Sequence, residues 1–320
     1  MKRLLKIGTR ESQLAVWQAT LVQLLLKERD IDSELIFIKS EGDKNTVTPL
    51  YELGVQGIFT KTLDAALLNK KIDMAVHSMK DVPTQLASGI RQAAVLKRAS
   101  YKDIFVFKGE RKQIEEELIS TQSNHYPLAT GTSFTIATSS IRRKAQWLHR
   151  YPNHIIENLR GNVNTRLRKI GENNWNGAIF AAAGLERIHL RPENSIDLDW
   201  MLPAPAQGAI TISCRQEDEE TFGAAHLLND KLTQKCTKIE RDFLKTLAGG
   251  CSTPISGLAL FEHDQIIFRG NICSINGKEI YHVRKEADME TADNLGIISG
   301  EEILKNERAK NIIHEIRNAK

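Results

Sequence analysis

Arginine is the residue type whose distribution in this sequence most clearly points to chemistry. Residues 142–191 contain eight of the twenty arginines, and their ten basic and three acidic residues give a net charge of +7, against +4 for the whole chain. A guanidinium is a rigid fork of donors that suits bidentate binding of carboxylate or phosphate. The cluster predicts a polyanionic ligand, with a solvated basic surface as the alternative. Its arginines are Arg142, Arg143, Arg150, Arg160, Arg166, Arg168, Arg187 and Arg191.

Cys251 is the cysteine whose neighbours suggest reactivity. Gly249 and Gly250 precede it, and two glycines leave the backbone free to adopt positive φ and the thiol unshielded. A tight turn with an incidental cysteine is the alternative. The four cysteines contain no CxxC pair and have no histidine at ligand spacing, so we expect neither a metal site nor a disulfide framework. Most of them are expected to be small, buried apolar residues.

The elements that must position these residues alternate between strand and helix along the first two thirds of the chain. This pattern predicts two α/β domains with largely parallel sheets. A change near residue 231 predicts a small C-terminal α+β domain, and residues 109–131 are expected to form a loop-rich linker. The expected strands are residues 4–7, 35–38, 72–76, 135–138, 154–157 and 178–180, then 255–260, 266–272 and 279–284. The expected helices begin near residues 14, 58, 140, 163, 181 and 231, and a last one covers about 303–316.

Polar clusters follow several of these strands. Ligands of open α/β sheets bind beyond the carboxyl ends of the strands, where loops and helix N-termini meet. This placement favours the anion site over the solvated surface and predicts a cleft between the two domains. The clusters are Thr9-Arg10, residues 77–84, Ser139 to Arg143, and Arg160-Gly161-Asn162.

Composition argues against a disordered, collagen-like or coiled-coil protein. Hydrophobic residues make up 41% and charged residues 26% of the chain, as in ordinary globular proteins. Since no apolar stretch approaches the ~20 residues of a membrane span, we expect no membrane partner. Lys6, Arg10 and Glu11 interrupt any export signal near the N-terminus, so a cytoplasmic location is expected.

A set of motifs in fixed order resembles the porphobilinogen deaminase family, also called hydroxymethylbilane synthases. The resemblance covers nearly the whole chain and is weakest over about the last seventy residues. The motifs are Ile7-Gly8-Thr9-Arg10-Glu11-Ser12-Gln13-Leu14-Ala15, Asp73–Thr84 containing Val76-His77-Ser78-Met79-Lys80-Asp81-Val82-Pro83-Thr84, Thr138-Ser139-Ser140-Ile141-Arg142-Arg143, Leu159-Arg160-Gly161-Asn162-Val163-Asn164-Thr165-Arg166-Leu167, Ala182-Ala183-Gly184-Leu185-Glu186-Arg187, Gln207-Gly208-Ala209 and Gly249-Gly250-Cys251-Ser252-Thr253-Pro254.

The resemblance implies a three-domain transferase that joins four porphobilinogen molecules head to tail, with loss of ammonia, in porphyrin biosynthesis. It implies a dipyrromethane cofactor attached to Cys251 by a thioether, and release of hydroxymethylbilane to the next enzyme. The first two domains are expected to be similar to periplasmic binding proteins, and the protein is expected to be a monomer. The implied domains are residues 1–101 with 204–228, residues 102–203, and residues 229–320.

The resemblance also assigns roles to single residues. Asp81 is implied to be catalytic, because its carboxylate can stabilise a cation formed when ammonia leaves. We expect Lys80 and Asp81 to point to opposite sides of an extended loop. Besides Cys251, Lys80 and Asp81, the implied cofactor-binding residues are Ser78, Ser139, Arg142, Arg143, Arg166 and Arg187. The implied substrate-binding residues are Arg10, Arg160, Arg166 and Gln207, although a hinge role is an equal alternative for Gln207.

Three places depart from the family pattern. Glu52 and Gln56 replace lysines that are usual in a loop near the cleft, although Lys61 remains close by in the sequence. Ala206 replaces a usual glycine, which is expected to stiffen the crossing between the domains. Residues 121–135 are longer than is typical.

Two other functions remain open at this stage. A two-lobed polyanion-binding protein without catalysis would explain the arginines, but it would not explain Asp81 or Gly249-Gly250-Cys251. A nucleic-acid partner would also explain the basic segments, because these attract phosphate groups. The aromatic content of 6% and the lack of a recognised binding motif argue against it.

Overall fold

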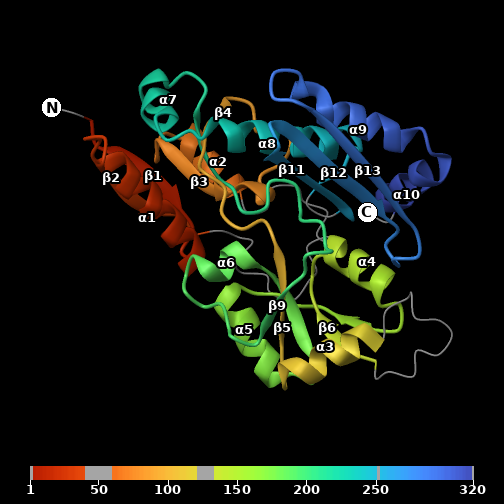
Figure 1. The fold of residues 1–320 in the computed structure, drawn as a ribbon. Helices are drawn as coiled ribbons and strands as arrows, with labels where there is room; N and C mark the ends of the chain where they lie inside the picture. Colours follow the sequence, from red (N-terminus) through yellow and green to blue (C-terminus); the bar gives the residue numbers. More distant parts are fainter. Residues whose placement is uncertain (1–2, 40–59, 121–132, 251–252, 319–320) are drawn as a thin grey trace.

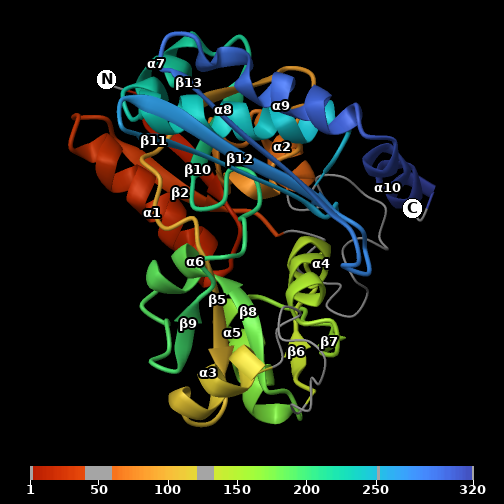
Figure 2. The same ribbon diagram turned by 45° about the vertical axis from the view of Figure 1, so that its right-hand side comes forward.

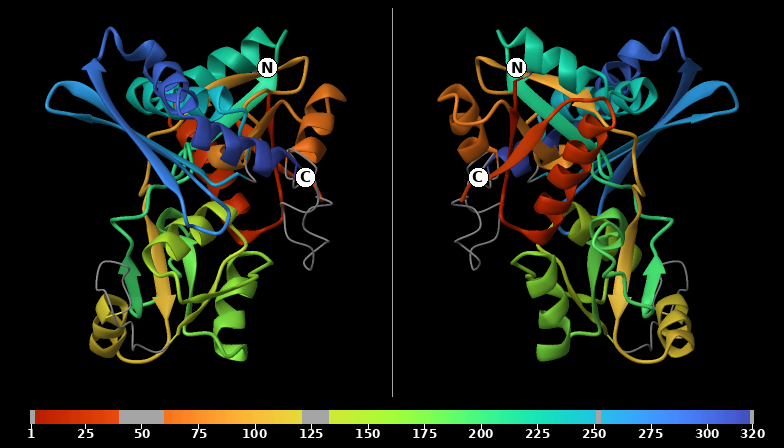
Figure 3. Two further views of the ribbon diagram at one scale, coloured as in Figure 1. Left: turned by 90° about the vertical axis from the view of Figure 1, so that its right-hand side faces the viewer. Right: turned by 90° about the vertical axis from the view of Figure 1, so that its left-hand side faces the viewer.

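The computed structural model describes residues 3–39, 60–120, 133–250 and 253–318. These residues form two α/β lobes and a third, smaller domain that packs beside the first lobe (Figure 1). Extended segments connect the second lobe to the rest of the molecule (Figure 3). No helix among the described residues is long and apolar enough to cross a membrane.

The first lobe contains a five-stranded sheet with helices on both faces. Its strands are β1 (Leu5–Thr9), β2 (Ser33–Phe37), β3 (Met74–Ser78), β4 (Ile90–Val95) and β10 (Ile210–Arg215), and its helices are α1 (Gln13–Lys27), α2 (Lys61–Leu68) and α7 (Glu219–His226). The strand order is β2-β1-β3-β10-β4, and only β10 runs against the others. Side chains of β3 alternate between two cores: Met74 and Val76 pack with α1 and α7, and Ala75 packs with α2.

The second lobe repeats this plan. Its strands are β5 (Asp103–Phe107), β6 (Thr135–Ala137), β7 (Ile155–Glu157), β8 (Gly177–Ala181) and β9 (Ser195–Asp197), and its helices are α3 (Arg111–Ser120), α4 (Ile141–Arg150), α5 (Val163–Glu172) and α6 (Ala182–Glu186). The order is β7-β6-β8-β5-β9, with β5 antiparallel to both of its neighbours. Trp147 of α4 is fully buried in the core on one face, and Leu185 of α6 lies in the core on the other.

The third domain is an antiparallel sheet with helices on one face. Its strands are β11 (Ile255–Glu262), β12 (Gln265–Cys273) and β13 (Ile280–Asp288), and its helices are α8 (Lys231–Thr246), α9 (Leu295–Leu304) and α10 (Glu307–Asn318). Phe243 of α8 packs against Phe268 of β12, with ring centroids 5.0 Å apart. A Cβ at Gly296 would lie 2.0 Å from the Ile239 carbonyl oxygen, so this glycine allows α8 and α9 to approach closely.

Two segments cross between the lobes, one between β4 and β5 and the other between β9 and β10, and they lie against each other. A Cβ at Gly208, where φ is +87°, would lie 2.5 Å from the Ser100 carbonyl oxygen, so this contact requires glycine. Ala206 also has a positive φ, of 63°, which explains why glycine is favoured at this position.

Glu240 of α8 joins these crossings to the third domain. Its buried carboxylate accepts from the Arg98 guanidinium at 2.6 and 3.1 Å, and from the backbone N–H groups of Ala206 at 2.6 Å and Ala259 at 2.8 Å. Because the four donors come from the two crossings and β11, one side chain connects all three parts of the molecule.

The expected fold class is confirmed: two α/β lobes with mainly parallel sheets and a small C-terminal α+β domain. The loop-rich linker is wrong over α3, a helix whose only buried side chains are Ile114 and Leu118, too few to give a clear period. The expected terminal helix over about residues 303–316 corresponds to α10, which begins at Glu307, and a separate helix, α9, precedes it. The expected elements did not include β4, β5, β9 and β10.

Candidate active site

Several of the predicted site residues lie where the lobes join, around the turn that follows β3. This turn is the 3-10 helix η2 (Met79–Asp81), so the expected extended loop is wrong and the opposite orientation of Lys80 and Asp81 loses its basis. Lys80 Nζ donates to Gln207 Oε1 at 3.2 Å. Burial and, to a smaller extent, the charge of Arg143 lower the pKa of Lys80 to about 8, and the charge of Asp81 opposes this shift.

Gln207 lies inside the crossing rather than on a surface. Its side chain is 0% exposed, and Nε2 donates to the Tyr101 carbonyl at 2.8 Å and to Asp103 Oδ1 at 3.0 Å. Both ends of the amide therefore bind protein groups, which favours the hinge alternative. A substrate contact of Gln207 stays a prediction.

Asp103, at the start of β5, is a buried carboxylate that the sequence analysis missed. Arg143 Nε and Nη2 donate to its Oδ1 at 3.0 and 2.7 Å, and Arg142 Nη1 lies 2.7 Å from its Oδ2. Burial alone would raise the pKa of Asp103, but the two guanidinium charges outweigh burial and hold it well below its usual range. Remaining donors of the two arginines bind the carbonyl oxygens of Leu202 and Ile179. In this structure the two arginines are therefore held by the protein itself.

Arg160 and Arg166 add positive charge at the junction. Among the described residues, Arg166 has no carboxylate partner comparable to Asp103. Asn162 caps α5 by accepting from the Thr165 N–H at 2.9 Å, and this local geometry places Arg166 in the first turn of the helix. Burial, with smaller effects of the Arg143 and Arg160 charges, lowers the pKa of Arg166 to about 10, and the charge of Asp81 opposes this shift. All three residues therefore lie near enough to Arg166 to act on its charge.

Arg187 and Arg10 approach from opposite lobes. Arg187 follows α6 in the second lobe, where Nη2 donates to the Gly208 carbonyl at 2.7 Å and the guanidinium lies 5.7 Å from the ring centroid of Trp17 in the first lobe. Burial lowers the pKa of Arg187 to about 10. Arg10 lies near buried His77, whose pKa is lowered to about 4 by burial and by the Arg10 charge.

The two predicted serine ligands also bind protein groups. Ser139 Oγ donates to the Leu159 carbonyl oxygen. The Ser78 hydroxyl accepts from Gln18 Nε2 at 2.8 Å. Each hydroxyl would have to exchange or share a partner to bind a ligand, and both roles stay predictions.

Cys251, Glu52 and Gln56 lie outside the described residues, as do residues 121–132 of the longer segment. Gly249, which precedes Cys251, is described and does not adopt the positive φ that glycine allows, and the unshielded thiol stays a prediction. Its Cβ would lie 2.6 Å from side-chain carbons of Leu244 and Ile255, so close packing explains the glycine. The other cysteines, Cys214, Cys236 and Cys273, are free and buried, as expected for small apolar residues.

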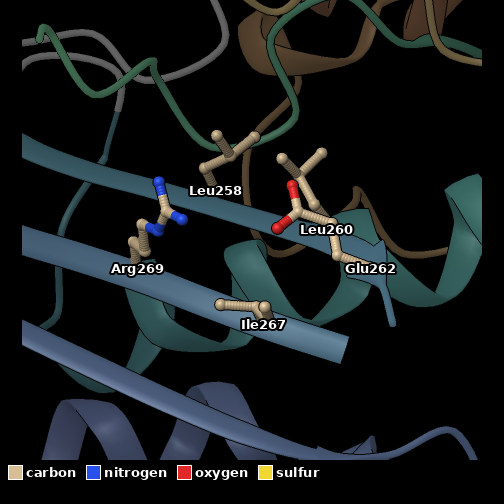
Figure 4. Close-up of a pocket in the computed structure, with 5 residues that line it drawn as sticks. All are labelled: Leu258, Leu260, Glu262, Ile267 and Arg269. Atoms are coloured by element: carbon tan, nitrogen blue, oxygen red, sulfur yellow. The ribbon is translucent and has the colours of Figure 1, made fainter. Parts of the chain in front are cut away.

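A shallow depression on β11 and β12 lies away from this site. Leu258, Leu260, Glu262, Ile267 and Arg269 line it on the sheet face opposite the helices (Figure 4). It contains none of the predicted site residues.

Several solved periplasmic binding domains are similar to part of the chain. The BvgS VFT2 domain of Bordetella pertussis matches with a TM-score of 0.41 and 12% identity, covering 70% of this chain and 85% of that one. An amino acid ABC transporter substrate-binding protein of Streptococcus pneumoniae matches with a TM-score of 0.38 and 11% identity, covering 73% of this chain and 90% of that one.

Similarity in sequence is closer and covers the whole chain. The protein named porphobilinogen deaminase from Acidithiobacillus ferrooxidans is 36% identical over 100% of this chain and 100% of its own length. The protein of the same name from Trichlorobacter lovleyi is 37% identical over 97% of this chain and 98% of its own length. The chloroplastic enzyme of Pisum sativum is 38% identical over 94% of this chain and 81% of its own length. The family model "Porphobilinogen deaminase, dipyromethane cofactor binding domain" matches residues 5–223, and the model of the C-terminal domain matches residues 234–305. Together with the cationic junction around Asp81, these matches show that the chain belongs to the porphobilinogen deaminase family of enzymes.

Proposed function

We propose that this protein joins four porphobilinogen molecules head to tail with loss of ammonia, on a dipyrromethane primer linked to Cys251 by a thioether, and releases hydroxymethylbilane. The observation that carries the proposal is the excess of buried positive charge around Asp81. Neither Arg166 nor Arg187 forms an ion pair with any carboxylate that the structure describes, although Arg187 is buried and Arg166 is half-buried. Buried charge of this kind favours an anionic ligand.

The donor set fits a dipyrromethane, because each of its pyrroles carries an acetate and a propionate. Cations from both lobes surround the junction, and a guanidinium can bind such a carboxylate in a bidentate way, contributing about 1.5–3 kcal/mol per hydrogen bond to a charged group. When bound, this cofactor supplies the pyrrole carbon to which the first substrate is joined. The residues proposed to hold it are Lys80, Asp81, Ser78, Ser139, Arg142, Arg143, Arg166 and Arg187, with Cys251 as the attachment point.

Asp81 is proposed to act on the cation that forms from porphobilinogen. When the carbon–nitrogen bond of the protonated aminomethyl group breaks, ammonia leaves with the bonding electrons and a cationic methylene-pyrrolenine remains. The Asp81 carboxylate accepts from pyrrole N–H groups and stabilises this charge where it develops. The charge of Asp81 raises the pKa of both Lys80 and Arg166, so its carboxylate lies near two cations of the junction.

Arg10, Arg160 and Arg166 are proposed to bind the substrate carboxylates. Gln207 is proposed to act indirectly, because its buried amide connects Lys80 of the first lobe to Asp103 of the second. The domain boundaries at residues 101, 203 and 228, a monomeric state, a cytoplasmic location and transfer of the product to the next enzyme remain part of this proposal.

Intact mass of the purified protein tests the proposal. The wild type should exceed its sequence mass by two linked pyrrole units, and Cys251→Ser should not. Cys214→Ser, which changes a buried cysteine in β10, is the matched control and should keep the excess. A wild-type mass that stays at the sequence value after incubation with porphobilinogen would contradict the proposal and favour a polyanion-binding protein.

A further inference from the structure

Helix α8 of the third domain contacts the turn that carries Lys80 and Asp81. Arg241 Nη1 donates to the carbonyl oxygen of Val82 at 2.9 Å and, at 3.4 Å, to that of Met79, and Nη2 donates to that of Pro83 at 2.5 Å. One guanidinium therefore spans residues 79–83, with Asp81 at the centre of the segment.

The geometry of this contact requires a fork rather than a single charge. The three acceptors are backbone carbonyls at successive points of the turn, and Met79 O also accepts from the Val82 N–H at 3.1 Å within η2. A lysine ammonium is a compact point charge on a flexible stem and cannot hold the same set in one orientation. The opposite side of the turn is held by the Met79 N–H, which donates to the Ala209 carbonyl at 3.0 Å.

Arg241 is itself held in place by its neighbours on α8. Glu240 binds both crossings, and Ile239 and Phe243 are fully buried in the core of the third domain. Residues 79–83 are therefore held in place relative to the third domain. The same domain carries Cys251, five residues after α8 ends.

We propose that Arg241 is a positioning residue that holds the 79–83 turn so that the Asp81 carboxylate keeps its place beside Arg166 and Lys80. Arg241 acts through the backbone of the turn and not through the substrate. The inference rests on the proposed role of Asp81. It predicts that loss of the guanidinium lowers turnover while the arginines that bind carboxylates, which lie on other elements, keep their places.

The test compares Arg241→Met, Arg241→Lys and Lys238→Gln in the full-length protein. Lys238 lies one turn earlier on α8, pairs with Asp242 at 2.6 Å and is over half exposed, so its change is the matched loss of one cation. We expect Arg241→Met to lower kcat by about 10- to 100-fold, the range set by an ångström-scale misplacement, with KM within about threefold of the wild type. Arg241→Lys should recover only part of kcat, and Lys238→Gln should match the wild type.

Amide hydrogen exchange supplies a readout that does not depend on activity. Peptides covering residues 79–83 should exchange faster in Arg241→Met than in the wild type or Lys238→Gln, while β3 exchanges at the same rate in all three. Unchanged exchange in this turn, or a kcat within twofold of the wild type, would overturn the inference. If the wild type itself consumed no porphobilinogen, the proposed function would fail instead, and the exchange result would still decide the contact.

Discussion

At the scale of single residues, the junction between the lobes contains arginines of two kinds. Arg142 and Arg143 bind Asp103, so their charge is partly balanced inside the protein. Arg166 and Arg187 lack such a partner among the described residues. The first pair is thus held in place by the protein, whereas the second pair provides the unbalanced charge that is proposed to bind an anionic ligand.

Asp81→Ala should keep the fold and lose turnover, because the half-buried carboxylate faces the cations of the junction. Removing one preorganised group of this kind costs about 10²- to 10³-fold in kcat. The rate of porphobilinogen consumption measures the loss, and the far-ultraviolet circular dichroism spectrum checks the fold. A near-normal rate would remove Asp81 from the mechanism.

Asp103→Asn should lower the free energy of unfolding by about 3–5 kcal/mol, because it leaves two buried guanidinium groups without their counterion. Urea denaturation measures this loss. Asp197→Asn is the matched control: that carboxylate is 30% exposed and pairs with Lys102 and Arg191, so about 1 kcal/mol or less is expected. Equal losses in the two variants would contradict the central place of Asp103.

At the scale of elements, the hairpin between β12 and β13 of the third domain packs against the second lobe (Figure 2). His149 Nδ1 of α4 lies 2.8 Å from the Gly277 carbonyl oxygen, and Gln146 of α4 donates to Ser256 Oγ of β11 at 2.9 Å. A Cβ at Gly277, where φ is +73°, would lie 2.6 Å from the His149 nitrogen. Backbone packs directly on backbone at this contact.

Gly277→Ala should therefore destabilise the protein by more than its positive φ alone explains. Gly109→Ala is the control, because its φ is +96° and nothing lies within 4 Å of the added Cβ. The control should cost about 1–2 kcal/mol and Gly277→Ala at least about 2 kcal/mol more, measured by the urea midpoint. Similar midpoints would show that the hairpin can move away from α4 at little cost.

At the scale of the whole molecule, folding buries ionisable groups in both lobes. Burial lowers the pKa of His77 in the first lobe and of His154 in the second to about 4, with the Arg10 charge adding to the effect at His77. Both histidines are neutral in the folded protein at pH 5, whereas an unfolded chain protonates them near pH 6.5. Their contribution to stability is therefore complete above about pH 6.5 and is lost as pH falls toward 4.

The free energy of unfolding should fall by roughly 1.4 kcal/mol per pH unit for each histidine in that range. Denaturation between pH 4 and pH 7.5 measures the slope. His154→Gln should reduce this slope, because glutamine does not titrate in this range. Glutamine can still accept from Trp147 Nε1, which lies 3.2 Å from His154 Nδ1 in the wild type, so the hydrogen bond can be kept. His314→Gln, a change on the exposed face of α10, should leave the slope unchanged. A slope that His154→Gln does not alter would contradict the assignment.

The α/β alternation, the C-terminal α+β domain and the basic residues at strand ends could all be predicted from the amino-acid sequence. These features depend on side-chain periodicity and on residues close together in the chain, which a sequence displays directly. The ordered motifs also identified the family before any coordinate was known. Helix α3 could not be found this way, because its surface is almost entirely polar.

Which charged side chains meet depends on how distant parts of the chain fold together. Asp103 is 40 residues from Arg143, Glu240 is 142 from Arg98, and Arg241 is 158 from Pro83. No local pattern marks such pairs, because an aspartate at the start of a strand has the same local sequence whether it faces solvent or two guanidinium groups. The fold decides the matter by burying these charges together, where each is stable only beside its partner.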